Sequence, residues 1–224
     1  LIEESSATSA GNNEWFVREL LPELKLQAKQ EGRNVYDMMD EWVESISPTE
    51  FVPVFLPFTM ASNVHPNAKG SFVGISYSHK RKHIVRSVFE GITFSHRYHL
   101  EKLLATREEP PKAIRLSGGA AKAKVWVQMF ADVMQLPVET LSADENGALG
   151  CAIAAAKATG EYKDLSDAVR HMSRISDAVM PNAALKDIYD RKYRLYLRAI
   201  ESLDPFWDEM QSLIEFSEGE KFNS

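Results

Sequence analysis

The amino-acid sequence predicts an α/β fold in which helices cover a sheet. After residue 112, short stretches rich in apolar and β-branched residues alternate with longer segments of helical period, an order typical of such folds. The first half combines helical segments with two further strand-like stretches. Hydrophobic residues make up 44% of the 224 positions and aromatic residues 10%, which is enough to fill a core and excludes disorder as a description of the whole chain.

Proline and glycine residues mark breaks and close contacts in the first half of the chain. Pro22 interrupts the first helical pattern, and Pro48 and Pro53 bracket a change from helical to strand period. Gly91 lies inside the longest helical pattern, where glycine costs about 1 kcal/mol relative to alanine, and such a glycine usually marks the close approach of another backbone. On these grounds we expect a strand end at 1–4, a polar turn at 5–13, helices at 14–21, 35–46 and 83–105, and strands at 51–58 and 71–76.

The second half follows a charged, proline-containing linker at residues 108–111. Asp164 is placed to cap one helix, and Gly160 to end the helix before it. We expect strands at 113–116 and 137–141 and helices at 123–135, 148–159, 164–172 and 185–203. Residues 204–216 form an amphipathic segment that either docks on its own domain or meets a partner subunit.

Charge and cysteine content exclude several classes of protein. A formal net charge of -6 argues against a protein that binds duplex nucleic acid, which needs a basic surface. The single cysteine, Cys151, excludes a disulfide framework and a zinc site built from several cysteines, and it fits a reducing cytosol. No stretch approaches about eighteen uninterrupted apolar residues, so we expect a cytoplasmic protein that does not enter a membrane. Because Leu1-Ile2 resembles a strand entered in its middle, we also expect a piece of a longer protein.

A glycine pair marks the first candidate for a binding site. Ser117-Gly118-Gly119-Ala120-Ala121 follows a predicted strand and precedes a predicted helix. Without Cβ atoms the two glycines let a ligand approach the main chain, and the start of the next helix offers unpaired N–H groups to anionic or polar atoms. The spacing is neither that of a P-loop nor that of a dinucleotide-binding fingerprint. Taken alone, such a pair is more often a plain turn than a binding site.

A second pattern lies upstream of this turn. Gly70-Ser71-Phe72-Val73-Gly74-Ile75 is followed, after a polar gap, by His83-Ile84-Val85-Arg86-Ser87-Val88-Phe89-Glu90. This string resembles the C-terminal signature of the FGGY family of carbohydrate kinases, with every specified position filled. Four other stretches also resemble segments of the family. Residues 116–138 resemble its adenosine-binding segment, and residues 148–152 its alanine-rich helix. Residues 8–16 resemble its nucleotide-side loop and helix, and residues 55–58 the segment leading to its substrate-side loop.

The resemblance implies a fold, a reaction and partners. Residues 1–203 are expected to form the C-terminal lobe of a two-lobe sugar kinase, an actin-like ATPase and ribonuclease-H-like domain, followed by a tail at 204–224. The complete enzyme would transfer the γ-phosphate of ATP, bound with Mg²⁺ between this lobe and the N-terminal lobe, to a sugar hydroxyl. Ser9-Ala10-Gly11-Asn12 with Glu14-Trp15-Phe16 resembles most the branch of L-xylulose kinases and xylulokinases, so a pentulose such as L-xylulose is the expected sugar. A homodimer through the tail stays open as an alternative.

The resemblance also implies which residues meet the nucleotide. By that resemblance, Gly118, Gly119 and Ala120 line the adenosine pocket. Gly11 and Asn12 approach the nucleotide from the opposite wall. Many members place a polar residue at the position of Ala123, and its absence here puts one adenine hydrogen bond in doubt.

Phosphoryl transfer needs further groups that we do not find in this sequence. It requires neutralisation of the phosphate charge, a metal site and a base for the hydroxyl proton. In the family, the phosphate turns and the catalytic Asp belong to the N-terminal portion, so we assign no catalytic and no metal-binding residue and expect the fragment to be inactive alone. Two other readings remain: a non-catalytic nucleotide-binding or scaffold domain of the same fold, and an isolated dimerisation module.

Several conspicuous side chains have simpler structural explanations. His83 fills a polar position of the signature and is expected to be structural. His79 lies four residues before it, a spacing that can hold a metal on a helix, but a polar helix entrance is the favoured reading. Asp132 is expected to pair locally rather than to act as a base, and Cys151 to be a small buried filler.

Overall fold

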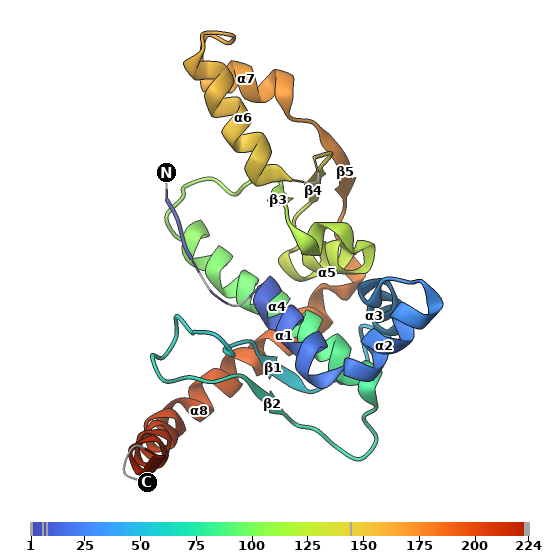
Figure 1. Cartoon of the computed structure of the whole chain (residues 1–224), viewed down its shortest axis with the longest axis vertical. Helices are drawn as coiled ribbons and strands as arrows, with labels where there is room; N and C mark the ends of the chain where they lie inside the picture. The colour runs from blue at the N-terminus through green and yellow to red at the C-terminus, as the bar shows by residue number, and fades with distance from the viewer. Residues whose placement is uncertain (1, 6, 8, 144, 222–224) are drawn as a thin grey trace. The chain divides into compact units, whose positions relative to one another are not determined.

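The computed structural model describes residues 2–5, 7, 9–143 and 145–221. The chain divides into two compact units (Figure 1). The first unit consists of Leu1–Glu108 together with Leu185–Ser224, and the second unit of Glu109–Ala184. The chain passes from the first unit to the second within the predicted linker at 108–111, and it returns to the first unit between Ala184 and Leu185.

The first unit consists of five helices and a two-stranded sheet in the part of the chain that the structure describes. Its elements are α1 (Ala10–Leu20), α2 (Pro22–Glu31), α3 (Val35–Glu44), β1 (Val54–Leu56), β2 (Ser71–Val73), α4 (Arg81–Leu104) and α8 (Lys186–Lys221). The helix α2 was not predicted. Pro22 indeed ends the first helix, but it also starts the next one, since proline at the first helical position loses no hydrogen bond. Gly32, in the left-handed conformation with φ of 66°, ends α2.

The core of the first unit forms where α4 packs on β1. The strands β1 and β2 are antiparallel, with Phe55 opposite Phe72 and their rings stacked at 4.6 Å between centroids. Gly91 faces β1: a Cβ at this position would lie 2.2 Å from the main-chain oxygen of Phe55. The close backbone approach that the sequence predicts at Gly91 is therefore confirmed.

Buried charges join α4 to its neighbours. Arg86 Nε donates to Glu90 Oε1 at 2.9 Å, and Lys192 Nζ on α8 donates to the same carboxylate at 2.8 and 3.0 Å. Arg86 Nη1 also donates to the main-chain oxygens of Val43 and Ile46, at the end of α3. All three charged side chains are largely removed from solvent, so the loss of one would leave its partners buried and uncompensated.

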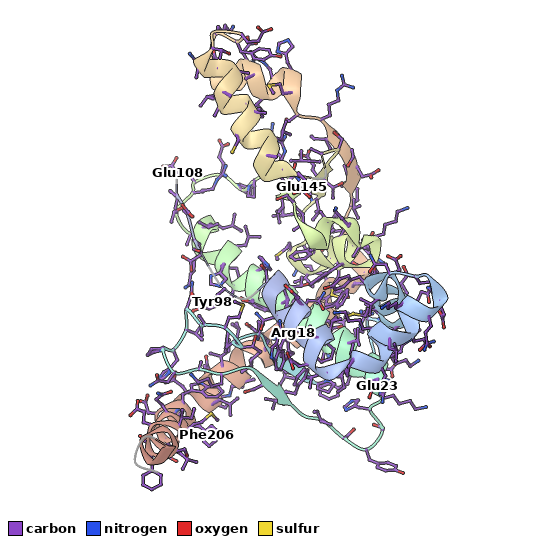
Figure 2. The ribbon with its side chains drawn as sticks, viewed as in Figure 1. Arg18, Glu23, Tyr98, Glu108, Glu145 and Phe206 are labelled. Carbon is purple, nitrogen blue, oxygen red and sulfur yellow. The ribbon has the colours of Figure 1, made fainter. Side chains whose placement is uncertain are left out.

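The helix α8 is longer than expected. The sequence predicts a helix at 185–203 with a separate tail, whereas α8 continues through Pro205 to Lys221. Trp207 is 1% exposed, and Asn67 Nδ2 donates to Asp208 Oδ1 at 2.9 Å, so the start of the tail docks on its own unit. Phe206, labelled in Figure 2, is by contrast 48% exposed.

The second unit contains a three-stranded sheet with helices. Its elements are β3 (Ile114–Leu116), a 3₁₀ turn (Gly119–Lys122), α5 (Lys124–Met134), β4 (Val138–Leu141), α6 (Asn146–Ala158), α7 (Leu165–Met172) and β5 (Ile175–Val179). The strand order is β3-β4-β5, with β3 parallel to β4 and β5 antiparallel to it. The crossover β3–α5–β4 is the strand–helix–strand alternation that predicts an α/β fold.

Details of the second unit confirm some expectations and correct others. Asp164 caps α7 by accepting a hydrogen bond from Asp167 N at 2.8 Å, as predicted. The strand β5 was missed, because its sequence Ile-Ser-Asp-Ala-Val has a central Asp and lies mostly exposed. The expectation of a buried Cys151 is wrong: this side chain is exposed on α6, where Ile153 is the buried residue. Within the described residues, no helix combines the length and apolar character needed to cross a membrane.

Candidate functional site

The glycine turn lies where β3 ends in the second unit. Gly118 has φ of 84° and ψ of -163°, a conformation that side-chain-bearing residues rarely adopt. A Cβ placed on Gly118 or on Gly119 would meet no atom within 4 Å. Ser117 and the two glycines are exposed, and Ala120 is half-buried. The turn thus presents bare main chain to open space, which is the property that the sequence predicts for a ligand-binding turn.

The segment after the turn forms a short 3₁₀ turn before α5. Ala121 N donates to Gly118 O at 3.1 Å, and Ala123 N to Ala120 O at 3.3 Å. Ala123 stands at the N-cap of α5 and provides no side-chain acceptor. The first N–H groups of α5 therefore lack a side-chain cap, and such groups favour polar or anionic atoms.

A buried carboxylate anchors α5. Asp132 is 3% exposed, and its Oδ1 accepts hydrogen bonds from Gln128 Nε2 at 2.8 Å and from Asn182 N at 2.7 Å. Gln128 Nε2 also donates to Met180 O at 3.1 Å. These bonds tie the helix that follows the glycine turn to the segment after β5. The prediction that Asp132 pairs locally is confirmed.

Gly11 and Asn12 lie at the start of α1 in the first unit, not in the polar turn expected there. Asn12 is fully buried: its Oδ1 accepts from Thr59 Oγ1 at 2.6 Å and from Thr59 N at 3.4 Å, and its Nδ2 donates to Ala7 O at 3.2 Å. A Cβ on Gly11 would lie 2.6 Å from Met60 Sδ. The side chain of Asn12 thus bonds within the protein.

The predicted nucleotide-binding residues lie in two separate groups, one in each unit. Gly118, Gly119 and Ala120 are adjacent in the second unit, and Gly11 and Asn12 in the first. That the two groups face one nucleotide stays a prediction. Sequence reasoning missed Thr59, the hydrogen-bond partner of Asn12; its position directly after the Leu-Pro-Phe stretch was the available signal.

Histidines of the first unit serve the fold. His83 Nδ1 accepts from Lys80 N at 2.8 Å, and its Nε2 lies 2.9 Å from Glu50 Oε1. His79 Nδ1 accepts from Ser76 N at 2.9 Å. The structural reading of His83 is therefore confirmed. Within the described part of the chain, no group of three or more His, Cys, Asp or Glu side chains is placed to hold a metal ion.

One carboxyl group and one imidazole away from the glycine turn have strongly shifted pKa values. Burial, reinforced by the nearby charges of Asp37 and Glu44, raises the pKa of Asp40 to about 6. Burial, with a smaller effect of His99, lowers the pKa of His96 to about 4. Both groups lie on helices of the first unit, α3 and α4, and both shifts arise mainly from desolvation, so they bear on stability.

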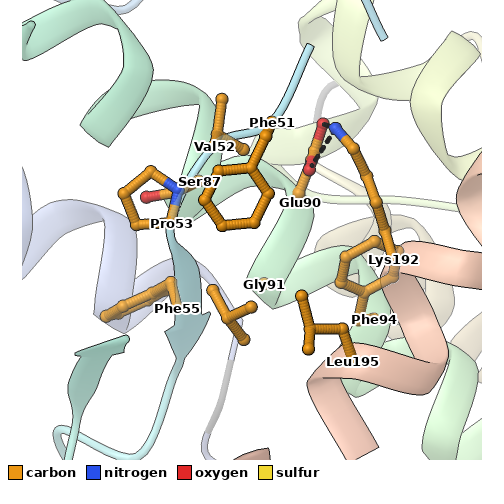
Figure 3. A pocket seen from close by; sticks show the side chains of 11 residues that line it. Phe51, Val52, Pro53, Phe55, Ser87, Glu90, Gly91, Phe94, Lys192 and Leu195 are labelled. Carbon is orange, nitrogen blue, oxygen red and sulfur yellow. Dashed lines mark hydrogen bonds and ion pairs between the residues drawn. The ribbon is translucent and has the colours of Figure 1, made fainter. Parts of the chain in front are cut away.

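A small cavity lies between β1, α4 and α8 (Figure 3). Phe51, Phe55 and Phe94 line it together with the Glu90–Lys192 ion pair, which Figure 3 shows at its edge. Its volume of about 20 Å³ is that of roughly one water molecule. It is too small for a sugar or a nucleotide, so the glycine turn is the better candidate for a site.

Comparison with known proteins decides the family. The model of the C-terminal domain of the FGGY family of carbohydrate kinases matches residues 1–159. This chain belongs to the FGGY family. It is 32% identical over 206 residues to the L-xylulose/3-keto-L-gulonate kinase of Escherichia coli (strain K12), and 32% identical over 204 residues to a probable L-xylulose kinase of Haemophilus influenzae. These alignments cover 92% and 91% of the chain but 39% of each relative.

Solved structures show the same fold. The crystal structure of xylulose kinase from Rhodospirillum rubrum superposes with a TM-score of 0.74 at 28% identity, over 88% of this chain and 38% of that one. A ligand-bound xylulose kinase from Lactobacillus acidophilus gives a TM-score of 0.71 at 23% identity, over 84% and 39%. The predicted actin-like fold of a sugar-kinase C-terminal domain is thereby confirmed. The FGGY chain spans about two fifths of the length of these relatives.

Proposed function

We propose that this FGGY domain is the nucleotide-binding part of an ATP-dependent carbohydrate kinase. The complete enzyme transfers the γ-phosphate of ATP to a sugar hydroxyl, and a pentulose such as L-xylulose is its first candidate substrate. One observation carries the proposal: in a chain of this family, the Gly118-Gly119 turn presents main chain to open space. The two L-xylulose kinases at 32% identity support the choice of sugar.

In this proposal the two lobes of the enzyme have different tasks: this domain binds the nucleoside, and the N-terminal lobe binds the phosphates. The glycine turn and the uncapped start of α5 offer main-chain surface and N–H groups to a nucleoside, and Asp132 holds α5 in place. Phosphoryl transfer depends mainly on positioning and on charge stabilisation. Mg²⁺, when bound with ATP, neutralises phosphate charge. In this proposal the N-terminal lobe supplies the phosphate turns and the base, and closure of the two lobes excludes water from the transferring phosphate.

The test is an activity assay on the complete protein. ATP, Mg²⁺ and a panel of pentuloses, hexonates and polyols are supplied in turn, and ADP release is measured. We expect sugar-dependent ADP release that is fastest with a pentulose, and none from the 224-residue chain alone. Nucleotide binding without phosphorylation of any sugar in the panel would contradict the kinase proposal and favour a non-catalytic domain of the same fold.

A further inference from the structure

Two segments that the sequence assigns to different ligands are joined in the first unit. The first, here called the nucleotide-side segment, comprises the described residues from Ser5 to Asn12. The second, the substrate-side loop, comprises residues 59–69. Asn63 Nδ2 donates to Ser5 O, and Asn12 Oδ1 accepts from Thr59 Oγ1. The two segments thus meet through hydrogen bonds at more than one point.

The bond between Asn12 and Thr59 lies at the centre of this contact. Asn12 is 0% exposed, and both polar atoms of its side-chain amide form hydrogen bonds. Oδ1 accepts from the main-chain N–H and the hydroxyl of Thr59, and Nδ2 donates to Ala7 O. Because the amide is buried, loss of the Thr59 hydroxyl would leave part of it unsatisfied, which is more costly than loss of an exposed hydrogen bond. The two segments cannot shift relative to each other without breaking this arrangement.

Glycines on either side tighten the same junction. A Cβ on Gly11 would lie 2.6 Å from Met60 Sδ, and a Cβ on Gly70 would lie 2.5 Å from Thr59 Cγ2. Thr59 and Met60 therefore pack against backbone that bears no side chain. The contact of Thr59 with Gly70 limits the positions that the start of the substrate-side loop can take, whereas the flexible side chain of Met60 is 68% exposed and restricts it less.

We propose that Asn12 and Thr59 are a positioning pair that transmits nucleotide binding to the substrate-side loop. The proposal rests on the proposed function, because it takes residues 9–12 to lie beside bound nucleotide and residues 59–69 beside the sugar. A nucleotide that fixes the start of α1 then also fixes Thr59 through the buried amide. By linkage, the sugar strengthens nucleotide binding by the same factor.

Three substitutions in the complete protein separate this role from simple stability. Thr59→Val keeps the shape of the side chain against Gly70 but removes the hydroxyl. Thr59→Ser keeps the hydroxyl. Thr49→Val makes the same chemical change at an exposed threonine, whose hydroxyl bonds Ser47 outside both segments. ADP binding, amide hydrogen exchange in residues 58–69 with and without ADP, and the unfolding temperature are measured for each.

We expect ADP to slow exchange in residues 58–69 by about five-fold or more in the wild type, Thr59→Ser and Thr49→Val, as one buried hydrogen bond allows. Thr59→Val should still bind ADP but lose this response. A response that survives in Thr59→Val, or a wild type that binds ADP with no response in the loop, overturns the positioning pair alone. Failure of the wild type to bind ADP overturns the proposed function and the pair with it. A lower unfolding temperature of Thr59→Val with an intact response assigns Thr59 a structural role only and also overturns the proposal.

Discussion

The main-chain oxygen of Phe55 occupies the space into which a side chain at Gly91 would extend, 2.2 Å from the position of an ideal Cβ. This contact brings α4 and β1 together at backbone distance. Gly91 directly follows Glu90, the last residue of the signature stretch, and Phe55 lies in β1, the strand that precedes the substrate-side loop. Glycine at this helix position thus sets the distance between the signature helix and the strand that leads to the loop.

The Gly91–Phe55 contact predicts a large loss of stability for Gly91→Ala. Alanine is the better helix former by about 1 kcal/mol, but its Cβ would overlap backbone that cannot move aside cheaply, so we expect a net destabilisation of about 2 kcal/mol. Gly150→Ala on α6 is the matched control, because a Cβ there meets no atom within 4 Å. Denaturant unfolding should show Gly150→Ala equal to or more stable than the wild type. Equal stability of Gly91→Ala and wild type would contradict the contact.

The tail predicts losses of stability of very different size at two neighbouring aromatic residues. Trp207→Ala removes a side chain that is 1% exposed, and we expect a loss of about 3–5 kcal/mol. Phe206→Ala removes one that is 48% exposed, and we expect less than about 1 kcal/mol. Thermal or denaturant unfolding of both variants measures the difference. Similar losses in the two variants would show that the tail does not dock through Trp207.

Asp40 predicts a dependence of stability on pH. Its pKa is raised from 3.8 to about 6, mainly by burial, so the folded state favours the protonated carboxyl. The stabilisation this gives is fully present below about pH 4 and is lost as the pH rises through 6. Asp40→Asn cannot ionise and should therefore gain stability relative to the wild type between pH 4 and pH 8.

We expect this relative gain to reach about 1 kcal/mol, after allowance for solvent screening of a half-buried group. Unfolding free energies of the wild type and Asp40→Asn at several pH values provide the measurement. Asp204→Asn, the same substitution at an exposed position on α8, is the control. A difference between Asp40→Asn and wild type that stays constant with pH would contradict the assignment.

The elements with regular apolar period could be predicted from the sequence. The helices α3, α4, α5 and α7 and the strands β3 and β4 follow from that period, and Gly91 and Asp164 behave as expected. The strand β5 could not be predicted in this way, because a mostly exposed strand does not show the alternation of apolar and polar residues that marks a half-buried strand. The extension of α8 beyond residue 203 could not be predicted either, because proline inside a helix removes a backbone hydrogen bond, yet α8 passes through Pro205 to Lys221.

The candidate site was predictable only where it depends on main chain. The open turn at Gly118 and Gly119 needs no partner, so a strand–glycine–helix order is enough to find it. The burial of Asn12 could not be foreseen, because it depends on Thr59, which lies 47 residues further along the chain. A contact of that kind depends on tertiary packing and leaves no local pattern in the sequence.

The central claim is that bare main chain at the glycine turn receives the nucleotide. Gly119→Leu in the complete protein tests it most directly, because a Cβ at Gly119 meets no protein atom within 4 Å and the variant should fold normally. Gly150→Leu, at another exposed glycine with open space, is the control. We predict that Gly119→Leu weakens ADP binding at least ten-fold, about 1.4 kcal/mol, at an unchanged unfolding temperature, while Gly150→Leu binds ADP like the wild type. Wild-type affinity for ADP in Gly119→Leu would contradict the account.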